Sequence, residues 1–141
     1  MVWHSAARAV ATFFEKRCEM RILVVDSDYI ARVMLYDRVK GFNRKIVTAD
    51  SVDSATARIH EDARFDLAFL GTRFPSDPDG GFRIAELCKQ KGIPFVGMSV
   101  VDGSTDAYAK QWMILGARRF IRKPFFASEG LESILASFQQ M

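Results

Sequence analysis

The sequence has few of the residues and patterns that define several common classes of protein. Only two of its 141 residues are cysteines, Cys18 and Cys88; they share no metal-binding spacing, and no secretory signal precedes them. We therefore expect reduced thiols in a cytoplasmic protein rather than a disulfide framework. The longest apolar run near the N-terminus, residues 9–14, is too short for a membrane span or a signal-peptide core, so no membrane association is expected.

Marks of nucleic-acid binding and of enzymatic chemistry are also scarce. The net charge is only +3, without a dense stripe of lysine and arginine, so direct contact with nucleic acid is not expected. The chain has no glycine-rich phosphate-binding loop. Its two histidines, His4 and His60, fall away from the strand ends at which a nucleophile and its base would be placed. We therefore do not expect an enzyme.

What the sequence does contain is a regular alternation of short apolar runs and amphipathic stretches. The short runs are rich in β-branched or aromatic residues and predict five strands, at 22–25, 46–49, 67–70, 95–98 and 119–121. The amphipathic stretches predict five helices, at 30–39, 52–60, 82–89, 107–115 and 131–138. This alternation predicts a single α/β domain with a doubly wound, five-stranded parallel sheet, whose ligand crevice lies at the carboxyl ends of the strands.

Three finer predictions follow from local spacing and composition. The apolar positions of the first helix are predicted to cover one face of the sheet: Ile30, Val33, Met34, Leu35 and Val39. Three glycines follow directly after helical runs and are predicted to be left-handed helix ends: Gly41, Gly92 and Gly116. Met98 and Met113 stand at apolar positions and are predicted to fill the core.

Three polar groups are predicted to meet at the carboxyl edge of the sheet. Asp26-Ser27-Asp28 follows the first strand, and clustered carboxylates suit a hard divalent cation, although the same residues also make an ordinary helix N-cap. Ser99 ends the fourth strand with a hydroxyl, and Lys123 follows the fifth with an ammonium group. Carboxylates, hydroxyl and lysine together suggest a phosphoryl site, yet the third strand ends at Gly71, which has no side chain.

From Arg21 to about Phe138 the sequence resembles the receiver domain of two-component response regulators. The resemblance rests on five segments: RILVVD at 21–26, DLAFL at 66–70, P-x(3)-DG at 75–80, IPFVGMS at 93–99 and GARRFIRKPF at 116–125. It implies a flavodoxin-like fold with strand order 2-1-3-4-5. It also implies transfer of a phosphoryl group from a histidine kinase to an aspartate after the third strand, with Mg²⁺ assisting and a Ser/Thr and a Lys reading the phosphorylated state.

Four positions match the functional residues of that family. By resemblance, Asp26 is the first acidic residue, Ser99 the Ser/Thr, Lys123 the lysine and Phe120 the switch aromatic. With the acceptor aspartate missing, we expect Lys123 to pair with Asp26 or with Asp28, in place of the metal's charge.

Four features depart from the family, and one of them is the loop at residues 75–80, which is one residue longer than usual. Gly71 stands where the phosphoacceptor aspartate belongs, and Ser27 stands at the second acidic position, so that Asp28 is displaced by one. Val100 stands where a small residue normally leaves phosphate access to the hydroxyl. Because Mg²⁺ rarely settles for one protein carboxylate and water, we expect weak or absent Mg²⁺ binding.

Residues 1–20 are predicted to be a separate helical extension of a receiver-like domain that spans residues 21–141. Trp3, Val10, Phe13 and Phe14 fall on one face of such a helix. It could pack on the domain, on a second copy or on a partner. Domains of this kind often begin with a sequence like that from Met20, so Met20 is an alternative start, and the role of residues 1–19 stays open.

These observations predict a stand-alone pseudo-receiver that binds a histidine kinase or another regulator, or forms a homodimer, without phosphorylation at the usual site. Its candidate interaction face comprises Lys110, Trp112, Arg118, Arg119 and Arg122. One alternative is a phosphorelay receiver that uses a substitute aspartate, namely Asp77, Asp79 or Asp28. Another is a sensor that binds a small ligand in the emptied crevice.

Overall fold

The computed structural model describes residues 19–41, 43–61, 64–100, 105–123 and 131–139. The predicted N-terminal helix therefore lies outside the described residues, apart from its last two positions. The elements alternate in chain order: β1 (Met20–Val25), α2 (Tyr29–Val39), β2 (Arg44–Ala49), α3 (Val52–Glu61), β3 (Leu67–Gly71), α4 (Gly80–Lys91), β4 (Phe95–Val100), α5 (Thr105–Leu115), β5 (Phe120–Lys123) and α6 (Leu131–Gln139). No helix in these ranges is long and apolar enough to cross a membrane.

The five strands form one parallel sheet in the order β2-β1-β3-β4-β5, which confirms the predicted topology. The register brings the strand ends to one edge: Val25 lies opposite Leu70, and Gly71 opposite Met98. Ser99 lies opposite Arg122, directly before Lys123. Residues from β1, β3, β4 and β5 can therefore share one pocket at this edge.

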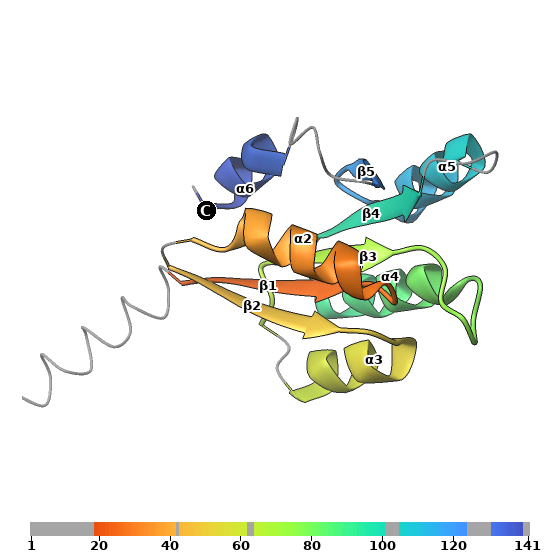
Figure 1. Ribbon diagram of the computed structural model, residues 1–141, viewed down its shortest axis with the longest axis horizontal. Coiled ribbons are helices and arrows are strands. Elements are labelled where there is room, and N and C mark those ends of the chain that lie inside the picture. The colour runs from red at the N-terminus through yellow and green to blue at the C-terminus, as the bar shows by residue number, and fades with distance from the viewer. Residues whose placement is uncertain (1–18, 42, 62–63, 101–104, 124–130, 140–141) are drawn as a thin grey trace, which may run out of the picture.

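Helices cover both faces of the sheet, with α2 and α6 on one side and α3, α4 and α5 on the other (Figure 1). Successive strand residues point to opposite faces, so Leu23 and Leu70 belong to one buried cluster while Ile22 and Phe69 belong to the other. Because both faces are covered, the inner strands β1, β3 and β4 are buried along almost their whole length, whereas the edge strands β2 and β5 also carry basic residues.

The buried side of α2 is only partly the one predicted. Leu35 and Val39 are buried as expected, whereas Ile30 is 65% exposed and Val33 is 47% exposed. Ala31 is buried as well, a small residue that does not stand out in an apolar pattern. Met113 of α5 is likewise 52% exposed rather than buried, while Met98 is fully buried as predicted.

Two of the three predicted glycine helix ends are confirmed. Gly92 and Gly116 have φ angles of 72° and 102°, in the left-handed region. The prediction for Gly41 is wrong, because α2 ends on extended backbone at Lys40 and the left-handed residue is Asn43, with φ 59°. Asparagine tolerates this conformation better than most other residues with a side chain, which explains why Asn43 can adopt it in place of the glycine.

The core under α5 is built around Trp112, which is fully buried. Its indole ring packs on Phe82 and Phe95, at centroid distances of 4.9 and 6.0 Å. It also lies directly over Gly97 of β4, where an added Cβ would stand 2.3 Å from an indole carbon. Gly97 is therefore the space into which the tryptophan fits.

Cys88 is a buried free thiol of α4, and its reactivity should reveal that burial. Burial raises the pKa of the Cys88 thiol from 9.0 to about 12. At pH 8 the reactive thiolate should therefore be about a thousandfold rarer than in the unfolded chain. In a Cys18→Ser background we expect iodoacetamide to label Cys88 only after urea unfolds the protein. Rapid labelling of the native Cys18→Ser protein would contradict this account.

The raised pKa of Cys88 also predicts a pH dependence of stability. The stability that this raised pKa contributes should be present below pH 9 and lost as the pH rises above it.

Candidate functional site

A pocket of about 200 Å³ lies at the carboxyl edge of the sheet. Its lining comes from the ends of β1, β3, β4 and β5: Asp26, Ser27, Asp28, Thr72, Arg73, Ser99, Val100 and Lys123. The structure thus brings together the polar groups that the sequence placed at these strand ends, including Thr72 and Arg73 directly after β3.

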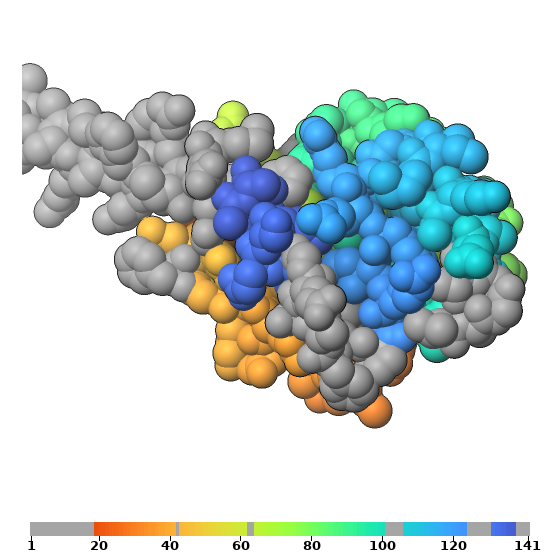
Figure 2. Space-filling model, turned by 90° about the horizontal axis from the view of Figure 1, so that it is seen from above, coloured from red at the N-terminus to blue at the C-terminus, as the bar shows by residue number. Residues whose placement is uncertain are grey.

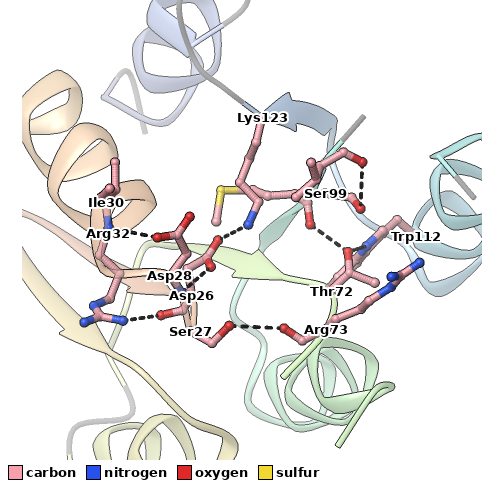
Figure 3. Close-up of polar contacts among 12 residues, drawn as sticks. Asp26, Ser27, Asp28, Ile30, Arg32, Thr72, Arg73, Ser99, Trp112 and Lys123 are labelled. Atoms are coloured by element: carbon pink, nitrogen blue, oxygen red, sulfur yellow. Dashed lines mark hydrogen bonds and ion pairs between the residues drawn. The ribbon is translucent and has the colours of Figure 1, made fainter. Parts of the chain in front are cut away.

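An ion pair between Lys123 and Asp26 crosses the pocket (Figure 3). Lys123 Nζ lies 2.6 Å from Asp26 Oδ2, and the two side chains are only 13% and 3% exposed. The other carboxylate oxygen of Asp26 accepts a hydrogen bond from the backbone N–H of Asp28 at 2.9 Å. The expected pairing of Lys123 with a retained acid is confirmed, and its partner is Asp26.

A second cation lies at the end of β1. Arg32 Nη1, from the first turn of α2, donates to the backbone carbonyl of Asp26 at 2.7 Å. Positive charge therefore approaches Asp26 from two sides, because the side chain pairs with Lys123 and the carbonyl with Arg32 (Figure 3). No pattern in the sequence indicated this contact, since arginine on the first turn of a helix is common on protein surfaces.

Gly71 ends β3 beside this ion pair and is buried. A Cβ added there would lie 3.1 Å from Asp26 Oδ2 and 3.3 Å from the carbonyl oxygen of Val25. The Asp26 carboxylate therefore leans toward the position from which an acceptor side chain would project. Glycine offers no carboxylate that could form an acyl phosphate, and the neighbouring acid is already neutralised by Lys123.

The acidic cluster after β1 is used for local structure. Asp28 is the N-cap of α2, with its carboxylate accepting from the Ile30 N–H at 3.0 Å. The Ser27 hydroxyl approaches the Arg73 carbonyl at 3.4 Å, a long contact (Figure 3). Across the described ranges, no group of three or more His, Cys, Asp or Glu side chains could hold a metal ion. These residues do not fit the oxygen-rich octahedral shell that Mg²⁺ requires.

Ser99 and Val100 form the opposite rim. Ser99 is 6% exposed, and its hydroxyl makes a 3.4 Å contact with the Val100 carbonyl. The Val100 side chain is 56% exposed at the end of β4, so the pocket rim here is apolar.

Two contacts that sequence reasoning missed connect the end of β3 to α5. The buried Thr72 hydroxyl donates to the Met98 carbonyl at 2.6 Å and accepts from the Trp112 indole N–H at 2.9 Å (Figure 3). Arg73 Nε donates to the Tyr108 hydroxyl at 2.6 Å, and its guanidinium lies 4.9 Å from the centre of that ring. No sequence spacing relates residues this far apart, so only the fold could reveal them.

The substitute aspartates occupy different places. Asp77 and Asp79 are not among the described residues that line the pocket. Asp77 stabilises its own loop: one carboxylate oxygen accepts from the Asp79 N–H at 3.1 Å and the other pairs with Arg83 Nε at 2.7 Å. Asp79 is exposed at the start of α4, and Asp28 lines the pocket but caps α2.

The candidate interaction face loses one of its five members. Trp112 is fully buried in the core, because the small Gly97 leaves room for it on the sheet. The four basic residues are exposed, as predicted: Lys110, Arg118, Arg119 and Arg122. Ile114, which is 84% exposed on α5, was not predicted and adds an apolar side chain. Helix α5 and strand β5 form one continuous surface (Figure 2, cyan to blue). Phe120, at the switch-aromatic position, is half-buried and packs against the core cluster that contains Trp112.

Comparisons with known proteins identify the fold. No protein-family model and no curated protein matches the chain. Among solved structures, NtrX from Brucella abortus is similar over 85% of this chain, with 27% identity and a TM-score of 0.72, but the match covers only 27% of NtrX. The receiver domain of NtrX alone matches 85% of this chain and 98% of its own length, with 28% identity and a TM-score of 0.66. A two-component response regulator from Clostridium difficile has 20% identity and a TM-score of 0.74, over 86% of this chain and 97% of its own.

These structures place the chain in a class by its architecture. Its five-stranded parallel sheet with order 2-1-3-4-5 is the flavodoxin-like fold, and its structural neighbours are receiver domains of response regulators. Since the chain spans about a quarter of full-length NtrX, the activity of that whole protein is not carried over.

Proposed function

We propose that this chain is an atypical receiver domain, a pseudo-receiver, that acts in signal transduction as a phosphorylation-independent protein-interaction module. The observation that carries the proposal is the ion pair between Lys123 and Asp26 beside Gly71. The position from which an acceptor would project has no side chain, and Lys123 is bound to Asp26 at 2.6 Å. Among the described residues that line the pocket, Asp26 is therefore engaged by Lys123 and Asp28 caps α2, and no cluster of three or more acidic, histidine or cysteine side chains is available to a metal.

The non-enzymatic part of the proposal rests on the charges of the pocket. A phosphoryl-transfer site depends on groups that stabilise developing negative charge. Here two cations at the end of β1 already bind Asp26: Lys123 binds its carboxylate and Arg32 binds its backbone carbonyl. The ion pair between Lys123 and Asp26 connects the ends of β1 and β5, and in this way it replaces the contacts that Mg²⁺ and an acyl phosphate would otherwise make.

Output then depends on surface contacts with a signalling partner, either a histidine kinase or another regulator. The face formed by α5 and β5 suits this role, because it combines four exposed basic residues with the exposed Ile114. Arginine is enriched at interface hot spots, and an apolar side chain among basic ones fits a partner surface that is apolar at its centre and acidic at its rim.

Intact mass spectrometry after incubation with acetyl phosphate and Mg²⁺ tests the proposal. We expect no phosphoryl adduct, because Gly71 cannot accept one, the Asp26 carboxylate is paired with Lys123, and the Asp28 carboxylate caps α2. Asp77→Asn and Asp79→Asn variants serve as controls that locate any adduct. An adduct that disappears in one of these variants, or in Asp28→Asn, would contradict the proposal and favour a substitute acceptor.

A further inference from the structure

One flank of α2 exposes four large apolar or aromatic side chains. Tyr29, Ile30, Val33 and Tyr36 are 69%, 65%, 47% and 45% exposed. At 100° per residue they share one side of the helix, whereas Ala31, Leu35 and Val39 on the other side are buried. We call these four residues the α2 stripe; α2 itself lies at the surface beside α6 (Figure 2). Contiguous apolar surface of this kind usually marks a contact site.

We propose that residues 1–18 of the same chain cover the α2 stripe. Their sequence places Trp3, Val10, Phe13 and Phe14 at helical spacing, which provides a second apolar surface that needs a partner. The described residues leave the stripe uncovered: its four side chains are exposed, and both faces of the sheet are already covered by other described helices.

The path of the chain favours this occupant over a separate molecule. The N–H of Met20, at the start of β1, donates to the carbonyl of Asn43 at 2.6 Å. Asn43 follows soon after Val39, the last residue of α2, so residues 1–18 join the fold beside the end of that helix. The 11 residues of α2 measure about 16 Å, and 18 residues would measure about 27 Å as a helix. The segment is therefore long enough to run back along the whole stripe.

The contact would be apolar rather than electrostatic. In α2, Arg32 and Arg38 outnumber Asp37, and residues 1–18 also contain more basic than acidic side chains. Like charges oppose the contact at low ionic strength, so added salt should preserve or strengthen it. An ion-paired contact would weaken under the same conditions.

Tryptophan fluorescence provides a direct measurement, because the chain has only two tryptophans and Trp112 is buried. The difference between the wild type and Trp3→Phe isolates the signal of Trp3. We expect that signal to be blue-shifted and protected from acrylamide, at low and high salt alike. An Ile30→Glu/Val33→Glu variant should raise its quenching several-fold and shift its emission to that of exposed tryptophan. Both substituted residues are exposed, so the fold should persist, which far-UV circular dichroism checks.

Ile114→Glu is the matched control, because it places the same charge at an exposed apolar position of α5. It should leave the quenching of Trp3 unchanged. Full quenching of Trp3 in the wild type would overturn the proposal, as would protection that the α2 variant does not change. Protection that appears only as the concentration rises, together with a dimer in sedimentation, would assign the stripe to a second copy and also overturn it.

Discussion

Replacing Lys123 with methionine should lower the free energy of unfolding by about 3–5 kcal/mol, the loss expected when one partner of a buried ion pair is removed. Methionine keeps most of the length of the lysine side chain but not its charge. It would leave the Asp26 carboxylate, 3% exposed, without its cation. Urea unfolding followed by circular dichroism measures the change.

Two further variants separate this effect from a general loss of lysine. Lys123→Met combined with Asp26→Asn should recover much of the lost stability, because the buried charge is removed together with its partner. Lys40→Met removes a lysine from a pair of similar length, 2.7 Å to Asp37, whose side chains are 58% and 69% exposed. Solvent screens that pair, so almost no change is expected. Equal losses in Lys123→Met and Lys40→Met would show that the pocket ion pair has no special importance.

Gly97→Ala should lower the free energy of unfolding by about 1–3 kcal/mol, through overpacking against Trp112. The sign of this effect is informative. Alanine in place of glycine within a strand would otherwise stabilise by about 0.5–1 kcal/mol, since it reduces the entropy of the unfolded chain. Here the new Cβ would lie 2.3 Å from an indole carbon, and the buried ring cannot move aside freely. Thermal or urea unfolding measures the difference.

Gly41→Ala is the control for that experiment. The atoms nearest to its Cβ would belong to the long side chain of Arg44, at 3.2 Å, and its backbone is not in the left-handed region. We expect a change close to zero. Combining Gly97→Ala with Trp112→Leu should cost less than the sum of the two single changes, because the smaller side chain releases the crowding. Additive losses would show that the two residues do not share that space.

The fold could be predicted from the sequence because the short apolar runs of the strands and the amphipathic stretches of the helices are both clear. A sheet covered on both faces needs short, continuously apolar strands, and runs such as that of β3 have no other simple explanation. The pairing of Lys123 with an acid after β1 could also be predicted, because the carboxyl ends of parallel strands meet at one edge of the sheet. The choice of Asp26 over Asp28 came only from the structure.

Other features depend on how the elements pack together, which the spacing of residues in the sequence does not reveal. The buried side of α2 includes Ala31, a residue too small to mark an apolar face. For this reason Ile30 and Val33 were assigned to the wrong side. Trp112 was predicted on the surface because tryptophan and arginine are typical of interfaces. Its burial depends on Gly97, whose missing side chain becomes meaningful only once β4 and α5 are in contact.

The proposed loss of the phosphorylation switch is tested most directly by an NMR titration of the wild-type chain with beryllofluoride and Mg²⁺, which together imitate a bound phosphoryl group. If Lys123 remains paired with Asp26 and Gly71 offers no acceptor, the amide resonances of Gly71, Ser99 and Lys123 should not move beyond the shifts that salt alone produces. Saturable shifts at these three residues, spreading to α5, would show that the pocket still binds a phosphoryl group and would contradict the proposed function.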